Sequence, residues 1–229
     1  SLRRQRQMCI RDRPYLVHLL HHPPCQKVEV RTDLSDVYRT HKPKLPREEA
    51  PAFPLSIIFV ARCKSAELLS RMLTELGVPN VSLHSMLPQS TRLHNLHMFR
   101  ARRVPILIST DVGSRGLDVP DVELVVNWDV PAAWEDYVHR VGRTARKGRP
   151  GWAVSFVTEH DVELVQTIED KIHKTLTEWD MPESQVLERL SHVSAAKRVA
   201  SMALHDEKFG EQRERNKRCL LYTSPSPRD

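Results

Sequence analysis

The stretch "YVHRVGRTARKGRPG", residues 137–151, carries arginines at a spacing suited to phosphate chemistry. Arg143 and Arg146 lie three positions apart, and His139 precedes them. Side chains three apart are neighbours on one face of a helix, so the spacing predicts two guanidinium groups presented together. Guanidinium groups bind phosphate oxygens through two parallel hydrogen bonds and stabilise the charge that develops in phosphoryl transfer. The pattern therefore predicts contact with a polyphosphate.

A second stretch, "STDVGSRGLD" at residues 109–118, directly follows the apolar run "PILI". Its glycines Gly113 and Gly116 allow a ribose or a phosphodiester to approach the main chain closely. The hydroxyl of Thr110 can donate to a phosphate oxygen, and Asp118 suits a ribose hydroxyl. A tight turn between a strand and a helix would show the same residue types, so this stretch alone leaves both interpretations open.

Nothing in the sequence is typical of a cradle for phosphates or a metal site. The chain contains neither a GxxxxGK[ST] phosphate loop nor an Asp-Glu-Ala-Asp tetrad to hold magnesium. The stretch "HLLHHPPC", residues 18–25, gathers histidines and a cysteine, but two prolines interrupt it and no second ligand pair follows at a metal spacing. We expect the end of a helix there and predict no metal site.

The elements that must position these residues alternate between strand and helix. "SIIFV" at 56–60 is a continuous apolar run typical of a buried parallel strand, and the helical pattern of 64–77 ends at Gly77. The alternation continues with expected strands at 81–85, 104–110, 122–128 and 152–158 and expected helices at 88–102, 132–146 and 159–179. It favours a parallel sheet with helices on both faces, whose ligands bind at the carboxyl ends of the strands.

The last of these helices has its own start signal. Thr158 and Asp161 have the spacing of a capping box, and apolar residues on one helix face follow: Val165, Ile168, Ile172 and Leu176. After Pro182 a further helical pattern becomes almost wholly charged. We therefore expect a helical extension over residues 180–218.

The two ends look foreign to the rest of the chain of 229 residues. Residues 1–13 contain five arginines and one aspartate, which supply +4 of the net charge of +6. "MCIRD" at 8–12 and "CLLYT" at 219–223 can be translations of opposite strands of one short DNA. We interpret 1–13 and 219–229 as adapter-derived artefact rather than as basic arms, and 14–54 as a helix end and a linker or loop.

The order of the motifs "IIFV", "LHSMLPQSTR", "STDVGSRGLD" and "HRVGRTARKG" resembles the second RecA-like domain of DEAD-box RNA helicases. The resemblance covers about residues 55–176 and implies a RecA-like domain over 55–179, followed by the extension. By this resemblance Arg143 and Arg146 reach the terminal phosphates of ATP across a cleft between two domains, Arg146 as an arginine finger. His139 and Arg140 correspond to residues that help couple those domains.

The same resemblance assigns the other candidate residues. Asp118 corresponds to the acid that contacts the ATP ribose, and Gly116 keeps its loop close to the nucleotide. The residues implied to contact the RNA backbone are Lys64, Arg92, Thr110 and Gly113. Contacts of this kind provide affinity without sequence preference.

The resemblance implies the C-terminal half of an ATP-dependent RNA helicase. ATP with Mg²⁺ would be held mainly by a first RecA-like domain that this chain lacks, so the chain alone should be inactive. The segments around "VTEHDVELVQTIEDKI" and "HDEKFGEQRERNKR" are similar to those of nucleolar helicases of ribosome biogenesis. That similarity implies rRNA processing, ribosome-assembly protein partners and a nuclear, nucleolar location.

A non-enzymatic interpretation stays open at this stage. The chain could be a stand-alone module that binds RNA or a helicase partner without using ATP. Cys25 and Cys63, the cysteines outside the foreign ends, form no disulfide pattern, which favours a reducing compartment. No apolar run approaches the length of a membrane span, so we expect no membrane partner.

Overall fold

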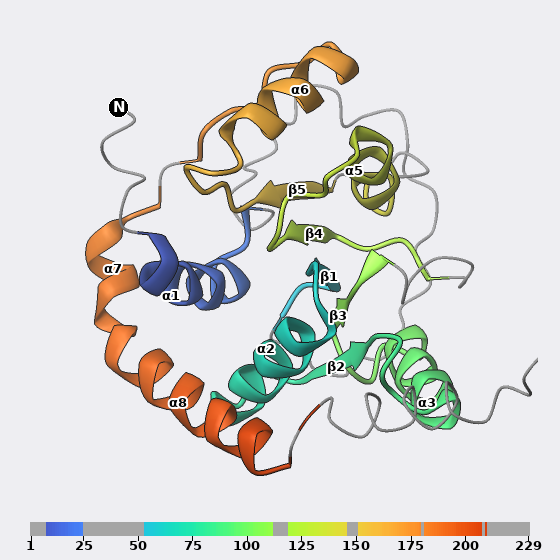
Figure 1. Ribbon diagram of the computed structural model, residues 1–229, viewed down its shortest axis with the longest axis vertical. Helices are drawn as coiled ribbons and strands as arrows, with labels where there is room; N and C mark the ends of the chain where they lie inside the picture. Colours follow the sequence, from blue (N-terminus) through green and yellow to red (C-terminus); the bar gives the residue numbers. More distant parts are fainter. Residues whose placement is uncertain are drawn as a thin grey trace, which may run out of the picture.

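Short apolar segments pair side by side as parallel strands. The computed structural model describes residues 8–24, 53–111, 119–145, 151–179, 181–207 and 209. The strands are β1 (Ser56–Phe59), β2 (Asn80–Leu83), β3 (Ile106–Ser109), β4 (Leu124–Asn127) and β5 (Trp152–Ser155). They form one five-stranded sheet in the order β2-β3-β1-β4-β5, with every pairing parallel (Figure 1).

Helices connect the strands and cover the sheet on both sides. The helices within the described ranges are α1 (Met8–His21), α2 (Cys63–Glu75), α3 (Gln89–Arg100), α5 (Trp134–Val141), α6 (Val162–Ile172), α7 (Glu183–Glu188) and α8 (Leu190–Asp206). Figure 1 shows α1, α2 and α8 on one side of the sheet and α3 and α5 on the other, with α6 beyond β5. This arrangement confirms the predicted parallel sheet with helices on both faces.

The central strands are apolar throughout because both of their faces are buried. Ile58 and Ile108 belong to the core shared with α1, α2 and α8. Ile57 and Leu107, one residue earlier on the same strands, point the other way into the core shared with α3. The continuous apolar runs in the sequence therefore correspond to a two-sided core.

The N-terminal helix begins earlier than expected. The sequence has no helical period over residues 1–13, yet α1 begins at Met8 and passes through Pro14. Leu16, Leu19 and Leu20 are completely buried. Tertiary packing of this apolar part stabilises the helix.

The helix α6 is shorter than predicted at both ends. Asp161 accepts hydrogen bonds from the backbone N–H and the hydroxyl of Thr158, at 3.0 and 2.6 Å, but the helix begins only at Val162. It ends at Ile172 because His173 adopts a left-handed conformation, with φ of 53°. The prediction that Leu176 continues the helix face is therefore wrong.

The described part of the region after Pro182 forms two helices, α7 and α8, that break at Arg189, and the rest of the expected extension, residues 210–218, lies outside the described ranges. In the part of the chain that the structure describes, no helix is both long and apolar enough to cross a lipid bilayer.

Candidate functional site

A buried arginine contacts residues at the carboxyl ends of three strands. Arg140, near the end of α5, is only 3% exposed. Its Nε and Nη2 donate to the two carboxylate oxygens of Asp111, two residues after β3, each at 2.6 Å. Two parallel charge-assisted bonds fix the orientation of the guanidinium as well as its position. The helix α5 is thereby attached to the end of β3.

The remaining contacts of Arg140 reach β4 and β1. Its Nη1 donates to Asn127 Oδ1 at 3.2 Å and to the carbonyl oxygen of Asp129 at 2.7 Å. The guanidinium also lies over the ring of Phe59, the last residue of β1, 5.1 Å from its centroid. A buried cation is tolerated only when paired and hydrogen-bonded, and Arg140 meets this condition entirely from within the described domain.

Asp129 makes a further contact at the same edge of the sheet. Its Oδ2 accepts a hydrogen bond of 2.7 Å from the backbone N–H of Ala61, two residues after β1. Side-chain contacts of Arg140 and Asp129 therefore join the carboxyl ends of β1, β3 and β4.

Arg143 does not lie on the helix face that its spacing predicts. The helix α5 ends at Val141, and Gly142 is its C-cap. The predicted helix over 132–146 is therefore too long, and Arg143 stands in the turn that follows. Its backbone N–H donates to the Arg140 carbonyl at 3.1 Å, and its carbonyl accepts from the N–H of Val122 at 2.9 Å.

This turn is held by pairing with residues just before β4. Thr144 forms an isolated bridge with Val122, and its hydroxyl donates to the Val122 carbonyl at 2.7 Å. A Cβ added at Gly151 would lie 2.0 Å from Thr144 Oγ1 and 2.5 Å from the backbone nitrogen of Ala145. Glycine is therefore required at 151, and Arg143 is placed by backbone contacts rather than by helix geometry.

The two arginines differ in what they bind. Arg140 is buried and every nitrogen of its guanidinium donates to Asp111, Asn127 or Asp129. Arg143 is half-buried, and its guanidinium makes no hydrogen bond or ion pair with any described residue. His139 is exposed on α5. Arg143 is thus a cation available to an external anion.

The candidate RNA-side residues share the carboxyl edge. Lys64 is exposed in the first turn of α2, which follows β1. Arg92 is in the first turn of α3, which follows β2, and Thr110 directly follows β3. The structure therefore brings together, at one edge of the sheet, three residues that are far apart in the sequence.

Arg92 and Thr110 are held by their surroundings. Arg92 Nη1 donates to Gln89 Oε1 at 3.0 Å, and its Nε is buried without a hydrogen-bond partner in the part of the chain described. A buried donor without a partner is costly, so this guanidinium is suited to donate a hydrogen bond to an anion. Thr110 is buried, and its N–H donates to the Leu83 carbonyl at 3.3 Å.

Four candidate residues lie outside the described ranges: Gly113, Gly116, Asp118 and Arg146. Sequence analysis assigned no role to Asp111, Asn127 or Asp129, the partners of Arg140. The usable signal was their position, since each is at or just beyond the end of an apolar strand. Side chains at that edge of a parallel sheet are near each other.

The described residues fit the phosphates of a nucleotide better than a metal ion. Arg143 offers a guanidinium, whereas the residues within the described ranges contain no cluster of three histidine, cysteine or acidic side chains that could hold a metal.

The parallel sheet, its helices on both faces and the polar residues at its carboxyl edge define a RecA-like α/β domain. A family model described as "Helicase conserved C-terminal domain" matches residues 49–148. Escherichia coli SrmB, a DEAD-box protein solved bound to the regulator RraA, is 37% identical over 56% of this chain and 75% of that chain, with a TM-score of 0.53. The chain belongs to the DEAD-box RNA helicase family, and it contains the C-terminal RecA-like domain.

Two further relatives refine this placement. An ATP-dependent RNA helicase of Mycosarcoma maydis, DBP8, is 52% identical over 91% of this chain. The chain spans 44% of the length of that relative. Saccharomyces cerevisiae Dbp5, solved bound to RNA and ADP BeF3, is 34% identical over 62% of this chain and 38% of that chain, with a TM-score of 0.51.

Proposed function

We propose that this chain supplies the C-terminal half of an ATP-dependent RNA helicase. The observation that carries the proposal is the contrast between two neighbouring arginines. Arg140 is committed to Asp111 inside the domain, whereas Arg143 has no partner among the described residues and is held in place by its backbone. A positioned, unpartnered guanidinium is suited to stabilise the charge of a transferring phosphoryl group.

In this function ATP and its Mg²⁺ are held mainly by a first RecA-like domain, and Arg143 and Arg146 contact the terminal phosphates across the cleft. Asp118 contacts the ribose, Gly116 keeps the loop close to the nucleotide, and His139 lies on the face of α5 that helps couple the domains. ATP supplies the free energy that drives a cycle of closure and opening. The binding of RNA and ADP BeF3 by the similar protein Dbp5 supports this proposal.

RNA binds along the carboxyl edge through backbone contacts from Lys64, Arg92, Thr110 and Gly113. The Asp111–Arg140 pair connects the residues proposed to bind RNA with those proposed to bind ATP. Asp111 directly follows Thr110, on the RNA side, and Arg140 precedes Arg143, on the ATP side, by three residues. A shift at the RNA edge is therefore transmitted to the ATP-side turn through a doubly hydrogen-bonded pair rather than through a flexible loop.

The test of this function compares the chain alone with a protein in which a DEAD-box first RecA-like domain precedes it. We expect ATP hydrolysis above background only in the two-domain protein, with stimulation by single-stranded RNA. The reason is that an arginine finger accelerates hydrolysis only where the phosphates are cradled. Steady-state phosphate release measures this. Comparable hydrolysis by the chain alone, or none in the two-domain protein, would contradict the proposal.

We further propose that the complete protein acts in ribosome biogenesis, in rRNA processing with ribosome-assembly proteins as partners, within the nucleolus. Similarity to the DBP8 helicases and the charged sequence after α8 support this assignment. Fluorescent tagging of the full-length protein is expected to label the nucleolus. A wholly cytoplasmic signal would contradict it.

A further inference from the structure

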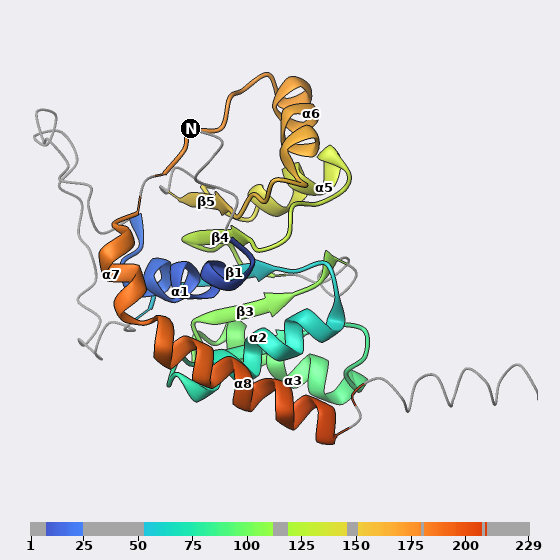
Figure 2. The same cartoon turned by 60° about the vertical axis from the view of Figure 1, so that its left-hand side comes forward.

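The helical extension forms part of the domain rather than a separate arm. Val193, Ala196 and Ala200 of α8 are buried in the same core as α1 and α2. Figure 2 shows α8 lying against α2, which it crosses at an angle. Small alanine side chains on the packed face let the two helices approach closely, so the extension is fixed relative to the sheet.

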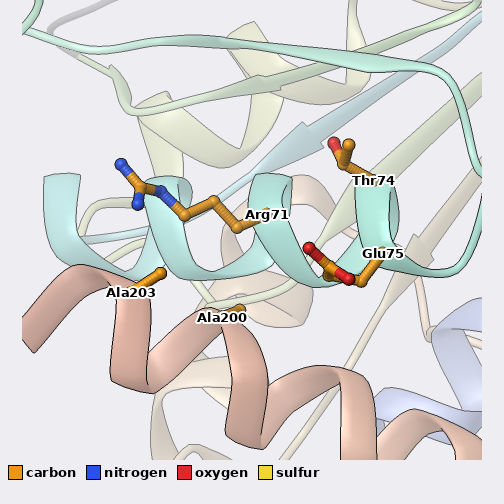
Figure 3. Close-up of a pocket in the computed structure, with 5 residues that line it drawn as sticks. All are labelled: Arg71, Thr74, Glu75, Ala200 and Ala203. Atoms are coloured by element: carbon orange, nitrogen blue, oxygen red, sulfur yellow. The ribbon is translucent and has the colours of Figure 1, made fainter.

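A groove lies between α2 and α8. It is lined by Arg71, Thr74, Glu75, Ala200 and Ala203 (Figure 3). In Figure 3 the side chain of Arg71 lies along α2, and its guanidinium extends past Ala203 toward the last turn of α8. This charged group therefore lies beside the C-terminal end of α8.

Arg71 joins α2 to the residue that follows α8. Its Nη1 and Nη2 donate to the two carboxylate oxygens of Glu207, the residue after α8, at 2.7 and 2.5 Å. Its Nε donates to Glu67 Oε1, one helical turn earlier, at 3.0 Å. The guanidinium lowers the pKa of the Glu207 carboxyl below its usual range, so the pair is ionised at neutral pH.

Glu67 passes the connection on to β2. Its second oxygen, Oε2, lies 3.3 Å from His84 Nε2 and accepts a hydrogen bond of 3.3 Å from the Ser82 hydroxyl. Hydrogen bonding with His84, and secondly with Arg71, lowers the pKa of this carboxyl despite partial burial. One acidic side chain thus bridges Arg71 and the strand that leads to the RNA edge.

His84 is the residue on which both connections converge. It is completely buried directly after β2, and Phe209 stands edge-on to its ring with centroids 6.1 Å apart. The His84 carbonyl accepts from the N–H of Leu87 at 3.2 Å, which shapes the loop 84–88. That loop leads into the first turn of α3, where Arg92 lies.

We propose that Glu207 and Phe209 form a clamp that positions the loop 84–88, and with it Arg92, for contact with the RNA backbone. Arg71 and Glu67 connect Glu207 to His84 through their hydrogen bonds. These are positioning residues, because they act through the loop and do not touch RNA themselves. The proposal rests on the proposed binding of RNA at the carboxyl edge.

The test uses the full chain with Glu207→Gln, which removes the charge that Arg71 binds. The side chain of Glu207 is 57% exposed, so this variant is expected to fold. The matched control is Asp206→Asn, the same change of charge at the preceding residue, whose side chain is 80% exposed. Amide hydrogen exchange of residues 84–92 is expected to speed up severalfold in Glu207→Gln and to stay unchanged in Asp206→Asn.

Binding to a short single-stranded RNA, measured by fluorescence anisotropy, provides the functional readout. Arg92→Ala is expected to raise the Kd about tenfold, as the loss of one charge-assisted contact. Glu207→Gln is expected to raise it about three- to tenfold in the unchanged background and to have no further effect in the Arg92→Ala background. A merely structural role would weaken binding equally in both backgrounds.

The possible outcomes separate the clamp from the function on which it rests. Unchanged exchange over 84–92 in Glu207→Gln, or equal losses of affinity in the two backgrounds, would overturn the clamp. Absence of RNA binding by the unchanged chain would overturn the proposed function of the edge, and with it the role of the clamp in binding. Faster exchange together with a loss that depends on Arg92 supports both.

Discussion

Replacing Arg146 with alanine in a two-domain protein that contains this chain is expected to lower kcat for RNA-stimulated ATP hydrolysis by about 10³- to 10⁵-fold. The guanidinium stabilises charge that develops only as the phosphoryl group transfers, so ATP affinity should change far less than kcat. Arg143→Ala is expected to lower the rate as well. Arg143→Lys should restore it poorly, because an ammonium group cannot form two parallel bonds with a phosphate. Single-turnover hydrolysis measures these effects.

A matched control removes an arginine that is remote from the site. Arg198 is exposed on α8, so Arg198→Ala should leave the hydrolysis rate close to that of the unchanged protein. RNA affinity should be nearly the same in the Arg146→Ala protein and the control, since backbone contacts at the carboxyl edge remain. Full hydrolysis in Arg146→Ala, or an equal loss in Arg198→Ala, would refute the role of an arginine finger.

The sheet could be predicted because its signals are local. Buried parallel strands require apolar residues on both faces, and segments such as "SIIFV" and "PILI" show this directly. The end of α2 was equally local, since Gly77 adopts a positive φ of 72°, which glycine tolerates without strain. The order of the strands was not predicted, because it depends on pairing between segments that are far apart in the sequence.

The end of α5 could not be read in the same way. The sequence pattern predicts a helix that continues to residue 146, yet the helix ends at Val141, with Gly142 as its C-cap. The cause is a long-range contact, because Thr144 pairs with Val122, and Gly151 packs against both Thr144 and Ala145. Tertiary contacts override helix propensity here, and the sequence around Val122 does not indicate that it pairs with Thr144.

The partners of Arg140 were hidden for a related reason. Asp111 lies 29 positions away in the sequence, and a lone aspartate after a strand is also typical of an ordinary turn. Only the folded sheet shows that the ends of β1, β3 and β4 converge on one guanidinium. The resemblance assigned Arg140 to coupling between domains, and the structure adds that its direct bonds are made within this domain.

Replacing Asp111 with alanine is expected to destabilise the chain by about 3 kcal/mol, because it leaves the buried Arg140 guanidinium without its counter-charge. This value is at the low end for breaking a buried pair, since the Asp111 side chain is 26% exposed and water can reach it. Chemical denaturation of the full chain measures the free energy of unfolding. Asp170→Ala, at an exposed position of α6, is the matched control and should cost less than about 0.5 kcal/mol.

A double variant separates the contribution of the ion pair to stability from the contribution of burying each side chain. Asp111→Ala combined with Arg140→Leu removes both charges, so it should be less destabilised than the sum of the single variants by about 1–3 kcal/mol. In the two-domain protein, Asp111→Ala should also reduce the stimulation of ATP hydrolysis by RNA more than it reduces RNA affinity, because the link between Thr110 and Arg143 is cut. Strictly additive losses, together with unchanged stimulation, would show that Arg140 merely fills space at the sheet edge. Non-additive losses of stability, together with reduced stimulation of ATP hydrolysis by RNA, identify this ion pair as the connection between the RNA-binding edge and the ATP-side arginine.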